Sequence, residues 1–260
     1  MQSPELFHML RAAIAGAEAI RQTRKDGFNV KRKDDNSPVT DADYAADRAI
    51  RKALAPTGLP ILSEEVEVSR SERQSWPAFW CVDPLDGTRE FAAGRDEFAV
   101  CIARIDGQTP TEGAIALPAT RMLYFTRNGK SWRVKWSRQA ELEDLIIEAD
   151  LMPGPDFTQP WVATVSRAYM DANTAAYLDQ LRDEQPNLKV LPSGSALKFC
   201  KLMEGKAHIY PRFAPCMEWD TAAGHALMHG IGMEIFASGG HPLTYNKDSL
   251  FNPDFIVRQR

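Results

Sequence analysis

Residues 83–88 read DPLDGT, a combination of residue types that could bind a metal ion and a phosphate. The apolar run 79–82 before them predicts a strand that carries Asp83 to its carboxyl end. Two carboxylates and a main-chain carbonyl oxygen are ligands suited to Mg²⁺. The N–H groups of Gly87 and Thr88, where a helix could begin, favour a phosphate. An ordinary turn explains the same residues, since Asp, Pro and Gly are frequent in turns for conformational reasons.

A second apolar segment also ends in carboxylates. Residues 59–62 predict a short strand that runs into Glu64 and Glu65, and solvated loop charge would by itself explain this pair. A helix is expected to begin near Asp41 and to hold Asp41 and Asp43 in its first turn, where the helix dipole favours acidic residues. Because two predicted strands end in acidic residues close together along the chain, we expect their carboxyl ends to meet at one site.

A further aspartate, Asp220, occupies the N-cap position expected for a helix of small residues, which could pack closely against a neighbour. Capping alone would explain an isolated aspartate there. The same helix continues through His225 and His229, whose i, i+4 spacing could bind zinc, but the glutamate of an H-E-x-x-H motif is missing. We therefore interpret both histidines as packing or solvated side chains.

The composition argues against several classes of protein. A net charge of -4 over 260 residues is unlike that of general nucleic-acid binders, although the basic cluster at residues 31–33 leaves a small anionic ligand open. P-loop, dinucleotide-binding and G-x-S-x-G motifs are absent from the sequence. The first residues lack a signal-peptide pattern, and no apolar run approaches the ~18 residues of a membrane span. We expect a cytoplasmic protein without a transmembrane segment, with peripheral attachment at the inner membrane left open.

The cysteines show no framework for a disulfide or a metal. They are Cys81, Cys101, Cys200 and Cys216, each among apolar neighbours and none in C-x-x-C spacing. Buried free thiols in a reducing compartment are the expected state, with a disulfide or a zinc site as the alternative.

The first part of the chain predicts two helices and an antiparallel sheet. A long amphipathic helix begins at Pro4, with Ser3 as its N-cap, and can end at Gly27. After the second helix, Asn128-Gly129 is a hairpin signal between alternating segments. The predicted strands of this region are residues 98–105, 113–117, 122–126 and 131–136. We expect the first two helices to flank the sheet that these strands form.

A domain boundary is predicted within residues 148–160, which contain three prolines and a glycine. Beyond it strands and helices alternate, which favours α/β layering. The predicted division is therefore 1–154, an α+β part with an antiparallel sheet, and 155–260, a smaller mixed α/β part.

Four elements taken together resemble the lithium-sensitive, Mg²⁺-dependent inositol monophosphatase superfamily. They are residues 37–43, 62–65, 83–88 and 219–224, in the order and spacing of that superfamily. Segments at 87–91, 194–200, 210–213 and 252–255 look like those of its CysQ-type 3′(2′),5′-bisphosphate nucleotidases. The resemblance covers nearly the whole chain. It implies a layered α/β/α/β/α fold with the site between the two domains.

The resemblance also implies an activity and a metal site. The activity is hydrolysis of the 3′-phosphate of adenosine 3′,5′-bisphosphate (PAP) to AMP and phosphate, in sulfur metabolism and nucleotide recycling. Two or three Mg²⁺ ions are expected, and the implied ligands are Glu64, Asp83, the Leu85 carbonyl, Asp86 and Asp220. Asp83 would bridge two ions, with Glu64 and Leu85 on one and Asp86 and Asp220 on the other.

The resemblance implies catalytic roles as well. Thr88, held by Asp43, would orient the attacking water together with Glu64. The amides of Gly87 and Thr88 would hold the phosphate as charge builds on it. These roles fit two-metal hydrolysis, in which one ion generates the nucleophile and the other stabilises the leaving oxygen.

The nucleotide end is expected to lie against the second domain. A helix is predicted over residues 195–203, directly after Gly194. Ser195 and Lys198 in its first turn suit a 5′-phosphate, and Arg212 adds a planar charged fork. Without the resemblance, an N-cap and two solvated cations would explain Ser195, Lys198 and Arg212. Tyr169 stands where the subfamily often has a histidine, and it is a candidate to stack on the base.

Two alternatives remain beside the nucleotidase. An inositol monophosphatase or a fructose-1,6-bisphosphatase-type sugar phosphatase would use the same metal site, so only second-domain residues discriminate. A catalytically inactive ligand-binding relative would lack a metal ligand or a water-orienting residue, and none of these is missing. The expected partner is a small phosphorylated nucleotide rather than a nucleic acid. The sequence leaves open the oligomeric state and the choice between PAP and its 5′-phosphosulfate relative.

Overall fold

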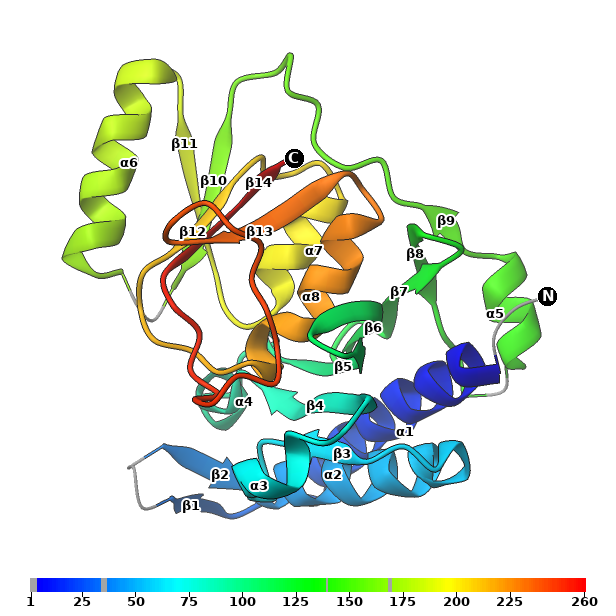
Figure 1. Ribbon diagram of the computed structural model, residues 1–260. Coiled ribbons are helices and arrows are strands. Elements are labelled where there is room, and N and C mark those ends of the chain that lie inside the picture. Colours follow the sequence, from blue (N-terminus) through cyan, green and yellow to red (C-terminus); the bar gives the residue numbers. More distant parts are fainter. Residues whose placement is uncertain (1–3, 34–36, 139, 168–169) are drawn as a thin grey trace.

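A seven-stranded sheet is the centre of the fold (Figure 1). The computed structural model describes residues 4–33, 37–138, 140–167 and 170–260, so the predicted N-cap Ser3 lies outside the described residues. The strands of this sheet are, in spatial order, β3 (Ile61–Ser63), β4 (Ala78–Asp86), β5 (Ala99–Asp106), β6 (Thr109–Leu117), β7 (Met122–Arg127), β8 (Lys130–Lys135) and β9 (Asp150–Leu151). β3 and β4 are parallel, and each of the other neighbouring pairs is antiparallel.

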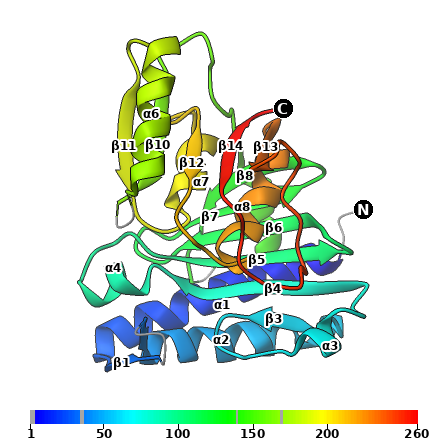
Figure 2. The same ribbon diagram turned by 60° about the vertical axis from the view of Figure 1, so that its left-hand side comes forward.

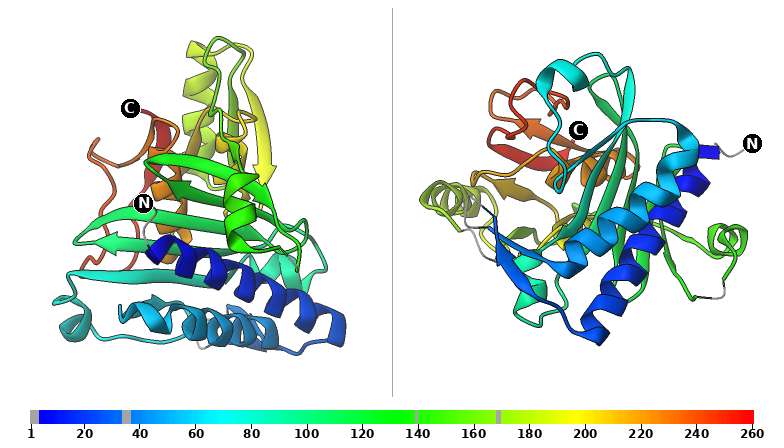
Figure 3. Two further views of the ribbon diagram at one scale, coloured as in Figure 1. Left: turned by 90° about the vertical axis from the view of Figure 1, so that its right-hand side faces the viewer. Right: turned by 90° about the horizontal axis from the view of Figure 1, so that it is seen from below.

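Helices cover both faces of this sheet. α1 (Pro4–Asp26) and α2 (Asp41–Leu54) lie side by side on one face, and α7 (Leu197–Met203) and α8 (Trp219–His229) lie on the other (Figures 1 and 3). The side chains of β4 alternate accordingly, because successive residues of a strand face opposite sides. Phe79 and Cys81 belong to the buried cluster on the α7/α8 face, whereas Trp80 and Val82 belong to the cluster under α1 and α2.

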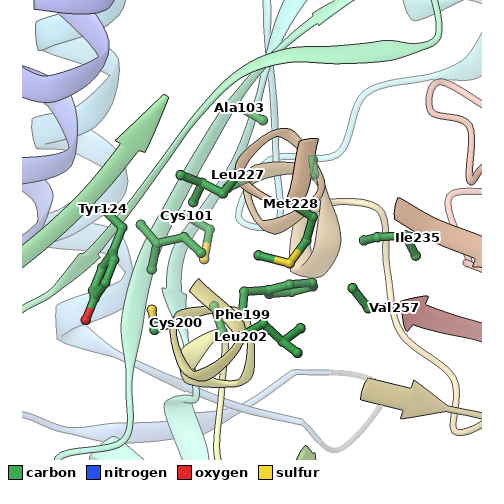
Figure 4. Close-up of a cluster of buried hydrophobic side chains, with 14 of the residues drawn as sticks. Cys101, Ala103, Tyr124, Phe199, Cys200, Leu202, Leu227, Met228, Ile235 and Val257 are labelled. Carbon is green, nitrogen blue, oxygen red and sulfur yellow. The ribbon is translucent and has the colours of Figure 1, made fainter. Parts of the chain in front are cut away.

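The α7/α8 face is packed closely. Figure 4 shows Cys101 of β5, Phe199 of α7, Leu227 of α8 and Val257 of the last strand meeting in one cluster. A Cβ atom on Gly224 of α8 would lie 2.4 Å from the Phe199 ring, so the glycine is what lets the two helices approach. This confirms the close packing expected from the small residues of α8.

The later part of the chain adds a second strand layer above α7 and α8 (Figure 1). β10 (Val162–Ser166) and β11 (Lys189–Ser193) are parallel neighbours, and α6 (Ala172–Glu184) lies beside them (Figure 2). A separate sheet has the order β12-β14-β13, with bounds β12 (Tyr210–Arg212), β14 (Phe255–Gln259) and β13 (Met233–Ala237). The shorter elements are β1 (Val30–Arg32), β2 (Pro38–Thr40), η1 (Ala55–Thr57), α3 (Arg70–Arg73), α4 (Thr88–Ala92) and α5 (Leu142–Ile147).

The layered α/β fold class predicted from the sequence is confirmed. Asn128 and Gly129 form the predicted hairpin turn, with φ of 52° and 69°, between β7 and β8. Gly27, with φ of 91°, follows the end of α1. All four cysteines are buried free thiols, as expected.

Two predicted helix starts are wrong by one to two residues. α7 begins at Leu197, so Ser195 precedes the helix, and α8 begins at Trp219 with Glu218 in the N-cap position. Asp220 therefore lies inside the first turn of α8 rather than capping it. The N-cap explanations of Ser195 and Asp220 are thereby excluded.

The predicted domain division, 1–154 and 155–260, stays a prediction. The chain leaves the large sheet after Leu151 and re-enters a strand at Val162, on either side of the proposed boundary. The buried cluster on the α7/α8 face draws side chains from both parts. Among the described residues, no helix is both long and apolar enough to cross a bilayer.

Candidate active site

Three carboxylates from distant parts of the chain converge beside the seven-stranded sheet. Asp83 and Asp86 lie at the end of β4, and Asp220 lies in the first turn of α8. One carboxylate oxygen of each lies within 4.8 Å of the others. Residues three apart on a regular strand face opposite sides, but the pairing of β4 with β5 is irregular between Asp83 and Asp86, which brings both carboxylates to one side.

Glu64 reaches the same pocket from the end of β3. Because β3 and β4 are parallel neighbours, their carboxyl ends meet, as predicted. The Glu64 N–H donates to the Val82 carbonyl at 3.3 Å. The Lys33 ammonium donates to the carboxylates of Glu64 at 3.0 Å and Glu65 at 2.9 Å. The sequence had shown a basic cluster at this lysine but not its contact with the two glutamates.

Burial and mutual repulsion disfavour ionisation of these carboxylates. Asp83 is 1% exposed, and burial, followed by the charges of Glu64 and Asp86, raises its pKa well above the usual value. Burial and the Asp86 charge raise the pKa of Asp220 to about 6. Burial raises the pKa of Glu64 to about 7 although Lys33 opposes the shift. A cation shared among the carboxylates would remove this conflict.

The donor set of the pocket fits a hard divalent cation. All five ligands implied by the family resemblance line this one pocket, namely Glu64, Asp83, Leu85, Asp86 and Asp220. Mg²⁺ prefers carboxylate and main-chain carbonyl oxygens as ligands, whereas softer metals prefer nitrogen and sulfur. The side of the pocket that these residues form is called the acidic side below.

Thr88 and Asp43 make the predicted contact. The Thr88 hydroxyl lies 3.0 Å from Asp43 Oδ1 and 3.1 Å from the Leu85 carbonyl oxygen, and it can donate its proton to either. Asp43 Oδ2 accepts from the N–H of Thr40 at 2.7 Å and from its hydroxyl at 2.6 Å, which completes a capping box at the start of α2. Asp43 therefore caps the helix and holds Thr88 with different oxygen atoms.

Gly87 is required by its backbone and by its surroundings. Its φ is 95°, in the left-handed region that disfavours side chains, and a Cβ there would lie 2.7 Å from the Glu97 carbonyl oxygen. α4 begins at the next residue, Thr88. Both residues line the pocket beside the carboxylates, where the sequence placed a phosphate.

Ser195 contacts the acidic side directly. Its hydroxyl donates to Asp86 Oδ2 at 2.7 Å, and the Ala196 N–H donates to the same oxygen at 2.5 Å. Ser195 has a φ of 53°, which is uncommon for a non-glycine residue. The structure thus directs the hydroxyl toward a candidate metal ligand. Its contact with a 5′-phosphate stays a prediction.

The basic side of the pocket consists of Lys198 and Arg212, and neither is a solvated cation. Lys198 is 3% exposed, and its ammonium donates to the Ser195 carbonyl at 2.6 Å. Burial, followed by the charge of Arg212, lowers its pKa to about 8. The Arg212 guanidinium donates to the carbonyls of Ala214 at 3.2 Å and Pro215 at 3.0 Å. Both cations line the pocket of the acidic side.

Sequence reasoning missed Glu97 and Arg167, which join the loop before β5 to the loop of Gly194 beside the pocket. Glu97 accepts from Arg167 through two nitrogens, at 2.9 and 2.7 Å, and from the Gly194 N–H at 2.9 Å. Glu97 precedes β5 in an ordinary acidic loop, so no local signal distinguishes it. Tyr169, the candidate base-stacking residue, lies outside the described residues.

The pocket has a volume of about 470 Å³. This is within the range of about 300–1,000 Å³ typical of small-molecule sites. Carboxylates and cations face the same space, so the pocket can hold a metal-bound phosphate and a second anionic group together. This arrangement is suited to hydrolysis of a phosphate ester.

Comparisons with known proteins show which family the chain belongs to. The sequence profile of the inositol monophosphatase family matches residues 1–254. The 3′(2′),5′-bisphosphate nucleotidase CysQ of Shigella flexneri is 40% identical, over 97% of this chain and 98% of that protein. The protein of the same name from Salmonella typhimurium is 37% identical over 87% of each.

Solved structures show the same fold. The crystal structure of CysQ from Bacteroides thetaiotaomicron superposes with a TM-score of 0.88 and 37% identity, over 98% of this chain and 97% of that chain. The suhB protein of Bartonella henselae, at 21% identity and a TM-score of 0.73 over 99% of this chain and 95% of that one, shares the fold. Because the profile spans nearly the whole sequence and full-length relatives are about 40% identical, this chain belongs to the inositol monophosphatase family.

Proposed function

We propose that this chain is a Mg²⁺-dependent phosphatase that hydrolyses the 3′-phosphate of adenosine 3′,5′-bisphosphate, producing AMP and inorganic phosphate. The observation that carries the proposal is the presence, in one pocket, of convergent carboxylates and of two oriented cations, Lys198 and Arg212. Relatives about 40% identical over their full length carry the name of this activity. The proposed setting is cytoplasmic sulfur metabolism.

The acidic side would hold the reacting phosphate through metal ions. Asp83 would be a ligand of two Mg²⁺ ions, Glu64 and the Leu85 carbonyl would be ligands of one, and Asp86 and Asp220 would be ligands of the other. Bound Mg²⁺ supplies an activated water and offsets the charge on the leaving oxygen. A third ion is compatible with the same carboxylates.

The chain's own groups would position the attacking water and the phosphate. Thr88, whose hydroxyl is held by Asp43, would orient the water, and the Glu64 carboxylate would take up its proton. The N–H groups of Gly87 and Thr88 would hold the phosphate oxygens at the start of α4. These roles require the hydroxyl of Thr88 rather than its size.

The basic side would read the second phosphate. Lys198 is buried with its ammonium turned toward the loop of Gly194 and Ser195, and Arg212 lies beside it on the same pocket. A 5′-phosphate would form charge-assisted hydrogen bonds with both cations. In the proposed division of labour, residues 1–154 supply most of the metal ligands, and residues 155–260 supply Asp220 and the nucleotide contacts.

Side-by-side phosphate release tests this proposal. Adenosine 3′,5′-bisphosphate, inositol 1-phosphate and fructose 1,6-bisphosphate would each be assayed with Mg²⁺, with EDTA and with added lithium. We expect strong preference for the nucleotide, loss of release in EDTA, and inhibition by lithium. Preference for either sugar phosphate would overturn the assignment of the basic side, and no release from any substrate would overturn the assignment as an enzyme.

A further inference from the structure

A second cluster of potential metal ligands lies under the far half of α8, away from the helix turn that carries Asp220. His225 and His229 are one turn apart on α8, and Glu234 is on β13, which follows the helix. One donor atom of each residue lies within 4.8 Å of the others. In the sequence only the two histidines stood out, because the glutamate of an H-E-x-x-H motif is missing. The structure supplies a carboxylate from Glu234 instead.

A chain of hydrogen bonds runs from His225 to the start of α8. The Thr221 hydroxyl lies 3.2 Å from the Glu218 carbonyl oxygen and 3.2 Å from the Tyr245 hydroxyl, so it can donate its one proton to either. When it donates to Glu218, Tyr245 donates to Thr221, and the Tyr245 oxygen accepts from His225 Nδ1 at 3.1 Å. In that arrangement the hydrogen of a neutral His225 ring is on Nδ1, and the Nε2 lone pair is available to a cation.

The other nitrogen of His225 faces the cluster. His225 Nε2 contacts the Glu234 carboxylate, and His229 Nε2 lies 3.2 Å from the same carboxylate. In a neutral His225 ring with its hydrogen on Nδ1, the Nε2 lone pair faces an anionic oxygen, and either a proton shared between the two atoms or a bound cation relieves this repulsion. Metal-binding histidines have this form, with the remote N–H donated to an oxygen that orients the ring.

We propose that His225, His229 and Glu234 form a site for Zn²⁺ or a similar cation such as Co²⁺, separate from the acidic side of the pocket. Two imidazole nitrogens and one carboxylate oxygen are a common ligand set for zinc, with a fourth position open to water. Imidazole selects such metals against Mg²⁺, which prefers oxygen ligands. This site does not depend on the proposed function.

The surroundings give an ion access to the site. They also provide partners for the Glu234 carboxylate, and one of these can be displaced. The His229 side chain is 26% exposed, whereas that of His225 is 2% exposed, so the path to the site passes His229. Arg260 donates to Glu234 Oε2 at 3.1 Å and the Ile235 N–H donates to Oε1 at 2.9 Å. The Arg260 side chain is 52% exposed, so its guanidinium can turn away when a cation binds. A bound ion would join α8 to β13.

Co²⁺ binding followed by visible absorption tests the site, because the spectrum reports nitrogen ligands and four-coordinate geometry. The titration would be done in excess Mg²⁺ on five proteins: the wild type, Asp83→Asn, His229→Gln, Glu234→Gln and His241→Gln. Asp83→Asn weakens metal binding on the acidic side. His241→Gln is the matched control, because His241 is an exposed histidine in the loop after β13.

We expect one equivalent of Co²⁺ with a four-coordinate spectrum in the wild type, in Asp83→Asn and in His241→Gln, displaced by Zn²⁺. In His229→Gln the affinity should fall at least tenfold. Glu234→Gln, which keeps the shape of the side chain, should give the same loss, and melting curves would verify that each variant is folded. Equal affinity in the wild type and His229→Gln, or loss of the signal in Asp83→Asn, would overturn the proposal and leave the cluster as an ion pair.

Discussion

The acidic and basic sides of the pocket are built in opposite ways. On the acidic side, Asp83, Asp86 and Asp220 point their carboxylates at one another, and burial raises the pKa of Asp83 and Asp220. On the basic side, Lys198 and Arg212 each donate to main-chain carbonyls of neighbouring loops. The carboxylates of the acidic side repel one another, and a bound cation would relieve this repulsion. The cations of the basic side are already held in place by neutral main-chain carbonyls.

This difference shows how one pocket can take a metal and an anion without the two sets of charges neutralising each other. Ser195 stands between them, because its hydroxyl donates to Asp86 and its carbonyl accepts from Lys198. The loop of Ser195 thereby keeps the Lys198 ammonium on the basic side and the Asp86 carboxylate on the acidic side. We infer that metal loss would affect the acidic side first, and that loss of the loop would affect substrate selection.

The largest effect is expected from Asp83→Asn, which removes the carboxylate proposed to contact two ions. Turnover should fall by about 10³-fold or more, since losing several kcal/mol of charge stabilisation costs a factor of ten per ~1.4 kcal/mol. Phosphate release measures the loss. Mg²⁺ should raise the melting temperature of the wild type and leave that of the variant nearly unchanged. Turnover within tenfold of the wild type would contradict the metal assignment.

A smaller but still large effect is expected from Thr88→Val. The valine keeps the shape but removes the hydroxyl held by Asp43, so kcat should fall by about 10²-fold, as for loss of a proton-positioning group, with little change in KM. Thr88→Ser retains the hydroxyl and should recover most of the activity. If the serine variant is as impaired as the valine variant, the side chain acts through packing rather than by orienting water.

The smallest effect is expected from Glu97→Gln, which weakens the link between the loop before β5 and the loop of Gly194. The neutral amide should loosen the contacts with Arg167 and Gly194, and because this ion pair is partly exposed the loss in kcat/KM for the bisphosphate should be about fivefold or less. Asp96→Asn is the matched control, since Asp96 is the neighbouring residue, its side chain is 72% exposed, and it pairs with Arg24 rather than with Arg167 or Gly194. Equal effects of the two substitutions would show that Glu97 does not position Gly194.

The sequence was most informative where chemistry and local structure coincide. Residues 83–88 show a strand end, a turn and two carboxylates within one short segment, and the hairpin at Asn128-Gly129 is a local signal of the same kind. The parallel pairing of β3 with β4 brings Glu64 to this segment, as expected from two apolar runs that end in acidic residues. Such features depend on near neighbours along the chain.

Features that depend on distant contacts could not be predicted. Glu97 meets Gly194 and Ser195 meets Asp86 across about a hundred residues, and nothing in either local segment indicates the partner. The start of α7 was misplaced because Ser195 has a left-handed backbone, in which its hydroxyl reaches Asp86. Glu234 is only five residues beyond His229, but the sequence did not show that β13 folds back onto α8.

The measurement that tests the account most directly compares wild type with Lys198→Met on two substrates, adenosine 3′,5′-bisphosphate and adenosine 3′-monophosphate, in saturating Mg²⁺. If Lys198 binds the 5′-phosphate, the variant should lose about 10- to 100-fold in kcat/KM on the bisphosphate, the value of a hydrogen bond to a charged group. It should lose less than about threefold on the monophosphate, which lacks that group. Equal losses on both substrates would contradict the separation of the pocket into a metal side and a nucleotide side.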